Sequence, residues 1–316
     1  MKIVASLYPA ESLQKQVRAE FPDLSFSFYK GMKELGDEIE TAEILMTYGE
    51  DLSDAIIEKA KALKWIMVMA AGVEKLPHEA IAKRNILVTN VRGVHKIPMG
   101  EFAIGYMLQY AKQSALFQTQ QQEKIWNRNV TLRELYDHTL LVVGAGAIGS
   151  QIGKYAKVFG MKTIGINRSG NRVEEFDEVY PMEQLNEILP AADYIVSILP
   201  STELTTGVFA KPQFSLMKNE AVFINMGRGS AVNEEDLIEA LNNGELAHAF
   251  LDVFAQEPLP EDHPFWSSDK VTITPHLTGI SRNYLKRGLE IFRRNLHMYL
   301  KGENKFENII DVHRGY

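Results

Sequence analysis

The sequence of 316 residues contains no cysteine. This absence excludes disulfide bonds, thiolate nucleophiles and zinc sites built on cysteine. The sequence also lacks any run of about 18 apolar residues, so we expect no membrane-spanning helix. The first apolar run is short and meets Glu11 early, so we expect no signal peptide and a cytoplasmic protein.

Charge of one sign is not concentrated anywhere along the chain. The 41 acidic and 34 basic residues are interspersed and give a formal net charge of −7. Nucleic-acid-binding proteins normally carry a basic tract or face, so we expect no nucleic-acid partner. No His, Asp or Glu cluster has ligand spacing, and His248 and Asp252 share only one side of a strand-like run. We therefore predict no metal site.

Short apolar runs alternate with segments of helix length along most of the chain. The strand candidates span residues 2–8, 43–49, 64–70 and 86–90, and six further apolar runs follow residue 139. Near-continuous apolar runs are typical of parallel strands covered by helices on both faces. The alternation predicts an α/β protein with doubly wound sheets, and the length predicts two domains.

Two long helices are expected outside this alternation. The first runs from Pro98 to about Gln122, and its first half is apolar all round, which indicates burial or an interface. The second runs from Arg282 to Leu300 and follows the final strand.

The stretch "LLVVGAGAIGSQIG" places three glycines, Gly144, Gly146 and Gly149, between an apolar strand and a helix over 147–159. The first glycine allows a tight turn, the second a close approach of backbone to a pyrophosphate, and the third close helix–strand packing. The bare glycine pattern is weak evidence, but its strand–helix context favours a dinucleotide site. The alternative is a glycine-rich turn that binds nothing.

Three polar residues follow the ends of apolar runs in the second half of the chain. Arg228 stands in "NMGRGSAV", Glu257 in "LDVFAQEPLP" and His276 in "TITPHLTG". Ligands of open parallel sheets bind beyond the carboxyl ends of the strands, so all three side chains could reach one cleft that faces the glycine loop.

The types of these three residues suit reduction of a 2-oxo acid. The planar fork of Arg228 can pair with a carboxylate and polarise the adjacent carbonyl. His276 can deliver a proton to the carbonyl oxygen, and Glu257, bonded to the imidazole, would orient it and favour its protonated form. Any one of them alone is more often a surface or capping residue, so the prediction depends on their joint placement.

With these motifs in their order and spacing, the chain resembles the D-isomer-specific 2-hydroxyacid dehydrogenases, which include glyoxylate/hydroxypyruvate reductases. The resemblance implies reduction of small 2-oxo acids to D-2-hydroxy acids with NAD(P)H, with Arg228, Glu257 and His276 as the catalytic set. It further implies a Rossmann cofactor domain, residues 98–281, inserted in a flavodoxin-like substrate domain, residues 1–97 and 282–316. A homodimer through the helix after Pro98 is also implied.

The resemblance extends to the binding residues. "MAAGVEKLP" is similar to the family's substrate loop, in which backbone amides around Ala71, Gly72 and Val73 hold the substrate carboxylate. The cofactor-binding residues that it implies are Met99, Gly144, Gly146, Ala147, Ile148, Gly149, Asn167, Arg168, Ser169, Leu199, Pro200, Thr205, Met226 and Asp252.

The second strand of the dinucleotide unit ends in Asn167, Arg168 and Ser169 rather than in a carboxylate. An acidic residue there would bind the ribose 2′-hydroxyl and repel a 2′-phosphate. Asn167 removes that repulsion, and Arg168 and Ser169 add a cation and a hydroxyl donor. We therefore predict NADP(H) over NAD(H), with Arg168 as a solvated loop residue as the alternative.

Two alternative functions stay open. A dinucleotide-sensing corepressor would have the same fold and the same three residues without needing turnover. A phosphoglycerate dehydrogenase would need cations for the substrate phosphate, and only Lys75 is close to the substrate loop.

Overall fold

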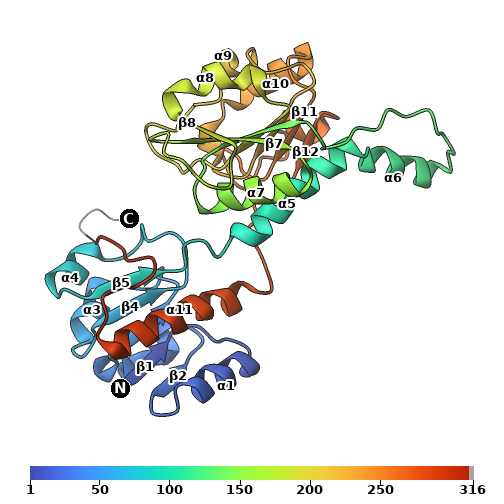
Figure 1. Cartoon of the computed structure of the whole chain (residues 1–316). Coiled ribbons are helices and arrows are strands. Elements are labelled where there is room, and N and C mark those ends of the chain that lie inside the picture. Colours follow the sequence, from blue (N-terminus) through green and yellow to red (C-terminus); the bar gives the residue numbers. More distant parts are fainter. Residues whose placement is uncertain (313–316) are drawn as a thin grey trace. The chain divides into compact units, whose positions relative to one another are not determined.

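The computed structural model describes residues 1–312, which form two compact units (Figure 1). Unit 1 contains Met1–Val94 together with the chain from Ser281 onward, and unit 2 contains His95–Ile280. Each unit is built around its own parallel sheet.

Unit 1 contains a five-stranded sheet in which every pairing is parallel. Its strands are β1 (Lys2–Ala5), β2 (Ser25–Phe28), β3 (Ile44–Thr47), β4 (Trp65–Val68) and β5 (Leu87–Asn90). The strand order is β2-β1-β3-β4-β5. This is the order of flavodoxin-like doubly wound sheets, so the predicted class of this sheet is confirmed.

Helices cover both faces of the unit 1 sheet because successive strand residues point to opposite faces. Ile3 and Ala5 of β1 lie in a core with α1 and α11, whereas Val4 lies in a second core on the other face. The helices of unit 1 are α1 (Glu11–Glu20), α2 (Met32–Leu35), α3 (Asp54–Lys59), α4 (His78–Lys83), α11 (Tyr284–Lys301) and the 3-10 helix η1 (Gly36–Thr41).

Unit 2 contains a seven-stranded sheet, also parallel throughout. Its strands are β6 (Thr139–Val143), β7 (Lys162–Asn167), β8 (Glu178–Pro181), β9 (Tyr194–Ser197), β10 (Val222–Asn225), β11 (His248–Leu251) and β12 (Val271–Ile273). The order β12-β11-β10-β9-β6-β7-β8 is that of the Rossmann fold with one added strand. The order reverses between β6 and β9, where such sheets bind their ligands.

The helices of unit 2 form one layer on each face of its sheet. Helices α5 and α7 pack together over Leu140 and Val142, and α8 to α10 pack over Leu141 and Val143. The helices of unit 2 are α5 (Lys96–Ala111), α6 (Ser114–Glu123), α7 (Ala147–Val158), α8 (Leu185–Ile188), α9 (Lys211–Phe214), α10 (Glu234–Asn243) and the 3-10 helices η2 (Met182–Gln184), η3 (Leu189–Ala191), η4 (Gly229–Ala231) and η5 (Pro264–Ser267).

Three details differ from the sequence prediction. The single helix expected from Pro98 to Gln122 is broken, because Gln113 adopts a left-handed φ of 54° between α5 and α6. The apolar α5 packs in the core, whereas the polar α6 projects from the rest of unit 2 (Figure 1). Strands β2 and β8 were not predicted, because an edge strand pairs on one side only and does not need a continuous apolar run.

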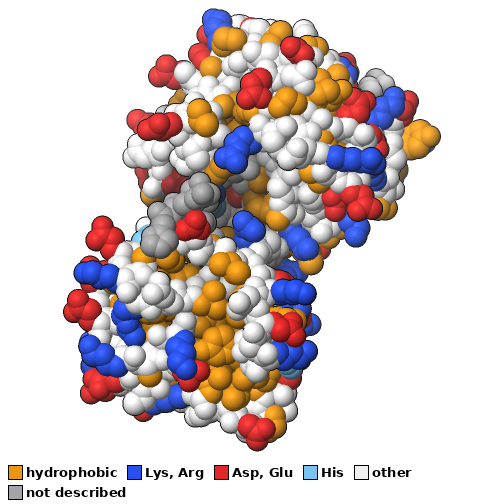
Figure 2. Space-filling view, turned by 60° about the vertical axis from the view of Figure 1, so that its left-hand side comes forward, with side chains coloured by type: hydrophobic (Ala, Val, Ile, Leu, Met, Phe, Trp, Pro, Cys, Tyr) orange, Lys and Arg blue, Asp and Glu red, His pale blue; other side chains and the backbone are white. Residues whose placement is uncertain are grey.

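Two further features of the structure concern the distribution of charge on the surface and the length of the apolar helices. On the face in Figure 2, acidic and basic side chains alternate without a large area of one sign. Within residues 1–312, no helix is both long enough and apolar enough to cross a membrane.

Candidate active site

The glycine loop lies at the reversal point of the unit 2 sheet, where β6 ends. Gly144 has a φ of 110°, and a β-carbon there would lie 2.7 Å from the carbonyl oxygen of Ile198, beyond β9. A β-carbon on Gly149 would collide with the carbonyl oxygen of Gly144. Both positions therefore require glycine for the strand–turn–helix geometry itself.

Gly146 has a different environment from Gly144 and Gly149. Nothing lies within 4 Å of the place of its missing β-carbon, so the backbone is open to a ligand there. Helix α7 begins at the next residue, and no side chain caps it. Its first intrahelical bond runs from Ser150 N to Gly146 O, which leaves the earlier N–H groups of Ala147, Ile148 and Gly149 for another acceptor. This cradle fits the pyrophosphate of a dinucleotide.

The end of β7 forms a compact turn organised by Asn167. Its amide nitrogen donates to the carbonyl oxygen of Asn171 at 2.8 Å, and its amide oxygen accepts from Ser169 N at 3.1 Å. A carboxylate could not make the first of these bonds, because it has no hydrogen to donate. Arg168 is exposed and pairs with no side chain or backbone group of residues 1–312.

The other predicted cofactor residues follow β9, β10 and β11 or lie on α5. Leu199 and Met226 are buried, and the Thr205 hydroxyl donates to the carbonyl oxygen of Pro200 at 2.6 Å. Met99 lies on α5 and is buried in the core between that helix and the sheet.

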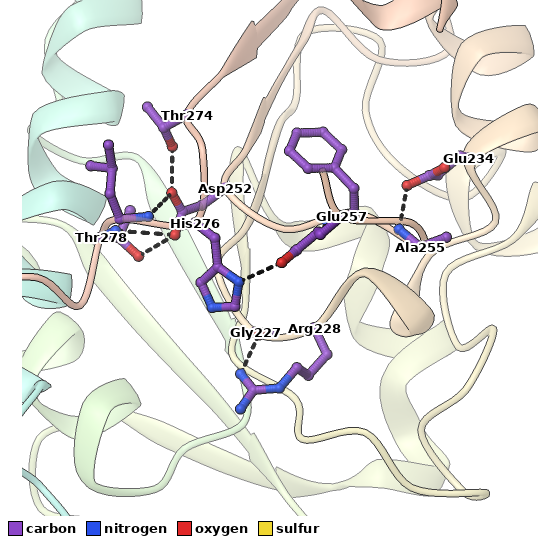
Figure 3. Close-up of polar contacts among 11 residues, drawn as sticks. Gly227, Arg228, Glu234, Asp252, Ala255, Glu257, Thr274, His276 and Thr278 are labelled. Carbon is purple, nitrogen blue, oxygen red and sulfur yellow. Dashed lines mark hydrogen bonds and ion pairs between the residues drawn. The ribbon is translucent and has the colours of Figure 1, made fainter. Parts of the chain in front are cut away.

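His276 and Glu257 meet in unit 2, with Nδ1 of the imidazole 2.7 Å from Oε2 of the carboxylate (Figure 3). The second carboxylate oxygen of Glu257 accepts from Phe254 N at 3.0 Å. The side chains of His276 and Glu257 are 51% and 36% exposed, so a ligand can reach them. Because Nδ1 faces a carboxylate, it carries the proton, and Nε2 is left for a substrate.

Asp252 holds the loop that carries His276. Its carboxylate is 1% exposed and accepts from the hydroxyls of Thr274 and Thr278, each at 2.6 Å, and from the N–H groups of Leu277 and Thr278. His276 itself has a φ of 50°, a conformation that L-residues seldom adopt. The four bonds to Asp252 fix the backbone on both sides of this conformation (Figure 3).

A second layer continues from Asp252 to helix α5. The hydroxyl of Tyr106 lies 2.7 Å from that of Thr274. Because Thr274 donates its only hydroxyl proton to Asp252, the Tyr106 hydroxyl donates to Thr274. Burial raises the pKa of Tyr106 to about 12, so the phenol keeps the proton that this role requires.

Arg228 stands on a turn after β10, and its guanidinium lies on the side toward which the His276 imidazole points (Figure 3). Buried Asn225 accepts from Gly227 N at 3.2 Å and donates to the carbonyl oxygen of Arg228 at 3.1 Å. A β-carbon on Gly229 would collide with the backbone of Phe254, so the arginine turn packs directly on the loop that leads to Glu257. Glu234, at the start of α10, accepts from Ala255 N at 2.8 Å in that same loop.

The predicted substrate loop lies in unit 1, after β4. Gly72 and Val73 line a cavity of about 420 Å³ together with Tyr48, Glu50 and Lys75. Lys75 forms a 2.8 Å ion pair with Glu50, so its charge already has a partner. Burial raises the pKa of Tyr48, which keeps this phenol neutral.

His248 lies on β11 and packs in the interior of unit 2 rather than in the site. Its Nε2 lies 2.9 Å from the Thr272 hydroxyl, and burial lowers its pKa to about 4 against the opposing effect of Asp269. Residues 1–312 contain no group of three or more His, Asp or Glu side chains that could hold a metal ion.

Comparison with known proteins agrees with this geometry. A family model described as "D-isomer specific 2-hydroxyacid dehydrogenase, NAD binding domain" matches residues 104–278. The chain is 33% identical over 283 residues to D-3-phosphoglycerate dehydrogenase of Methanocaldococcus jannaschii, spanning 89% of this chain and 54% of that protein. It is 29% identical over 263 residues to glyoxylate/hydroxypyruvate reductase A of Yersinia enterocolitica, spanning 80% and 82% of the two chains.

A solved structure shows the same fold along both chains. A D-isomer specific 2-hydroxyacid dehydrogenase family protein from Aeromonas salmonicida is 34% identical, with a TM-score of 0.83 over 98% of this chain and 99% of that one. The fold, the glycine loop and these matches define an NAD(P)-dependent oxidoreductase. The chain belongs to the D-isomer specific 2-hydroxyacid dehydrogenase family.

Several residues that hold these loops were not predicted from the sequence. They are Asn90, Asn225, Tyr106, Glu234 and His78. An asparagine as the last residue of a buried strand was an available signal, because β5 and β10 both end in one. Tyr106 and His78 carry no such signal, since their partners are far away in sequence or are backbone atoms.

Proposed function

We propose that this protein reduces small 2-oxo acids, of the glyoxylate and hydroxypyruvate type, to D-2-hydroxy acids with NADPH. The observation that carries the proposal is the 2.7 Å pair of His276 and Glu257, beside Arg228, at the carboxyl edge of an NAD-binding domain. The named activity of the Yersinia relative supports the substrate class.

In this proposal, the cofactor pyrophosphate binds at the start of α7, held by the N–H groups that follow Gly146, with Leu199, Pro200 and Thr205 beside the adenosine half. Met99, Met226 and Asp252 would lie toward the nicotinamide. When bound, NADPH supplies the hydride.

His276 would donate the proton from Nε2 to the carbonyl oxygen as negative charge develops there. Glu257, bonded to Nδ1, fixes the ring orientation and stabilises the imidazolium that precedes donation. Arg228 would pair with the substrate through its guanidinium and polarise the carbonyl. The amides around Ala71, Gly72 and Val73 would bind the substrate carboxylate.

Preference for NADPH is supported by the turn after β7. With Asn167 in the place of a carboxylate, no negative charge at this position opposes a 2′-phosphate. The exposed guanidinium of Arg168 is available for a bidentate contact, and Ser169 offers a hydroxyl.

Substrates without a second anionic group are favoured by the unit 1 cavity. Glu50 and Glu74 line it along with Lys75, so carboxylates outnumber cations there. A phosphorylated substrate would face this imbalance, which argues against the phosphoglycerate dehydrogenase alternative despite the identity to the Methanocaldococcus protein. An intact His276–Glu257 pair also favours turnover over a role confined to dinucleotide sensing.

A homodimer formed through α5 and α6 is part of the proposal. Exposed apolar side chains gather on and after α6, including Phe117, Ile125 and Trp126, and Trp126 is 92% exposed. A second copy would bury such a surface. Light scattering at micromolar concentration would show twice the chain mass, whereas the mass of a single chain would contradict the dimer.

The test of the function is a panel of 2-oxo acids assayed with NADPH and with NADH. We expect turnover of glyoxylate or hydroxypyruvate, and a higher kcat/KM with NADPH. Equal or better use of NADH would overturn the cofactor preference. Binding of NADPH without oxidation by any member of the panel would favour the sensing role.

A further inference from the structure

The turn after β4 contains five consecutive backbone donors without a protein acceptor. The N–H groups of Ala71 to Lys75 donate to no backbone or side-chain acceptor among residues 1–312. Four of these residues, Gly72, Val73, Glu74 and Lys75, line the 420 Å³ cavity of unit 1. Runs of unpaired N–H groups in turns are the usual protein receptor for small anions.

Two carbonyl groups of the same turn, by contrast, accept hydrogen bonds. The carbonyl oxygen of Ala71 accepts from the side-chain amide of Asn90 at 2.6 Å. The carbonyl oxygen of Val73 lies 2.9 Å from Nε2 of His78 and 3.1 Å from the N–H of Leu76. Two side chains from outside the turn, Asn90 and His78, therefore fix the carbonyls of Ala71 and Val73.

The orientation of both donors follows from their other contacts. Asn90 is 2% exposed, and its amide oxygen accepts from Arg92 N at 3.0 Å, which leaves the NH₂ group to face Ala71. His78 faces a carbonyl oxygen, so Nε2 carries the hydrogen, while Nδ1 is buried without a partner. Among residues 1–312, the bond from Nε2 is therefore the one polar contact that the ring makes.

Fixing a carbonyl also fixes the next N–H, because the two point in opposite directions across a trans peptide. The bond to Ala71 directs the N–H of Gly72 away from Asn90. The bonds to Val73 direct the N–H of Glu74 away from His78. Two N–H groups that bracket Val73 are thereby held in place before any ligand arrives.

We propose that Asn90 and His78 are positioning residues that hold the N–H groups of Gly72 and Glu74 ready for the carboxylate of the substrate. This inference rests on the proposed function, and it adds two side chains that act through the backbone. Such preorganisation lowers the cost of ordering the turn when the anion binds.

The test uses two His78 variants of the full chain. His78→Phe keeps the aromatic volume and removes the donor, whereas His78→Gln keeps an amide donor near the place of Nε2. We expect His78→Phe to raise KM for the preferred 2-oxo acid about ten-fold, with kcat and the KM for NADPH nearly unchanged. His78→Gln should restore most of the wild-type KM.

Two further readouts separate positioning from general loosening of the fold. The ratio of kcat/KM for the 2-oxo acid to that for its methyl ester should fall in His78→Phe, because only the acid uses the anion turn. Asn90→Leu, of similar size, removes the donor to Ala71 together with the acceptor for Arg92 and adds no charge, and it should lower the same ratio. An unchanged ratio in both variants, or an equal loss with His78→Gln, would overturn the proposal.

Calorimetric titration with oxamate, an unreactive monocarboxylate probe, makes the result independent of turnover. Weaker oxamate binding to His78→Phe, restored in His78→Gln, supports the positioning role even if no 2-oxo acid is reduced, in which case only the proposed function fails. Equal oxamate affinity in wild type and His78→Phe, or no binding to wild type, overturns the positioning role.

Discussion

The loop of His276 in unit 2 and the turn of Gly72 in unit 1 present polar groups in opposite ways. In unit 2, the buried acid Asp252 accepts N–H and hydroxyl groups of the loop. In unit 1, the buried amide Asn90 donates to a carbonyl of the turn. Because Asp252 binds the donors of its loop, the group that this loop offers to a substrate is the side chain of His276. Because Asn90 binds a carbonyl of its turn, the groups that this turn offers to a substrate are backbone N–H groups.

If this comparison is correct, unit 2 changes should act on kcat and unit 1 changes on KM. The largest effect is expected for His276→Asn, which keeps a polar side chain but removes the proton donor. We expect kcat to fall about a thousand-fold while the affinity for NADPH, measured by fluorescence titration, stays the same. A loss confined to KM would place His276 in binding rather than in proton transfer.

The next effect tests how Asp252 holds the loop. Asp252→Asn directs an NH₂ group at donors that need an acceptor, so the loop of His276 loses its fixed conformation. We expect kcat to fall about a hundred-fold, because His276 then meets Glu257 less well. Tyr106→Phe, which removes only the outer bond to Thr274, is the matched control and should cost much less. Equal losses in the two variants would contradict the ranking.

The contrast between the two units also explains why some site residues could be predicted from the sequence and others could not. Arg228, Glu257 and His276 were found because their side chains carry the chemistry and follow apolar strands, and the structure places them in one region of unit 2. Strand–helix alternation predicted the doubly wound parallel sheets, although not the edge strands β2 and β8. Asn90 and His78 were missed because they bind backbone carbonyl groups. Every residue has such a group, so the partner leaves no pattern in the sequence. The break at Gln113 was missed because no glycine or proline marks it.

A smaller effect concerns the cofactor rather than either loop. Arg168→Ala should raise KM for NADPH about ten-fold and leave KM for NADH unchanged. Only NADPH carries the 2′-phosphate with which the guanidinium would form a charged contact. Arg172→Ala, also exposed and close in sequence, is the control and should have less effect. Parallel changes for both cofactors would mean that the phosphate is recognised elsewhere.

The smallest effect concerns the stability of unit 2 and leaves the site untouched. Burial lowers the pKa of His248 to about 4 from an ordinary value of 6.5. The unfolded chain therefore takes up a proton at a pH where the folded chain does not. The contribution of neutral His248 to the free energy of unfolding is complete above pH 6.5 and is lost as the pH falls toward 4. We expect the free energy of unfolding to lose about 2 kcal/mol from this group between neutral pH and about pH 5. Denaturant melts of His248→Gln should lack that part of the pH dependence, and an identical dependence in both proteins would contradict the assignment.

The central claim is transfer of a hydride from NADPH to the carbonyl carbon of a 2-oxo acid. The direct measurement uses NADPH deuterated at the transferring position of its nicotinamide ring, with hydroxypyruvate as acceptor and mass and chiral analysis of the product. The account predicts D-glycerate with one deuterium at C2, formed by the wild-type protein and nearly absent with His276→Asn. Glycerate without deuterium, the L-isomer, or equal product from the variant would contradict it.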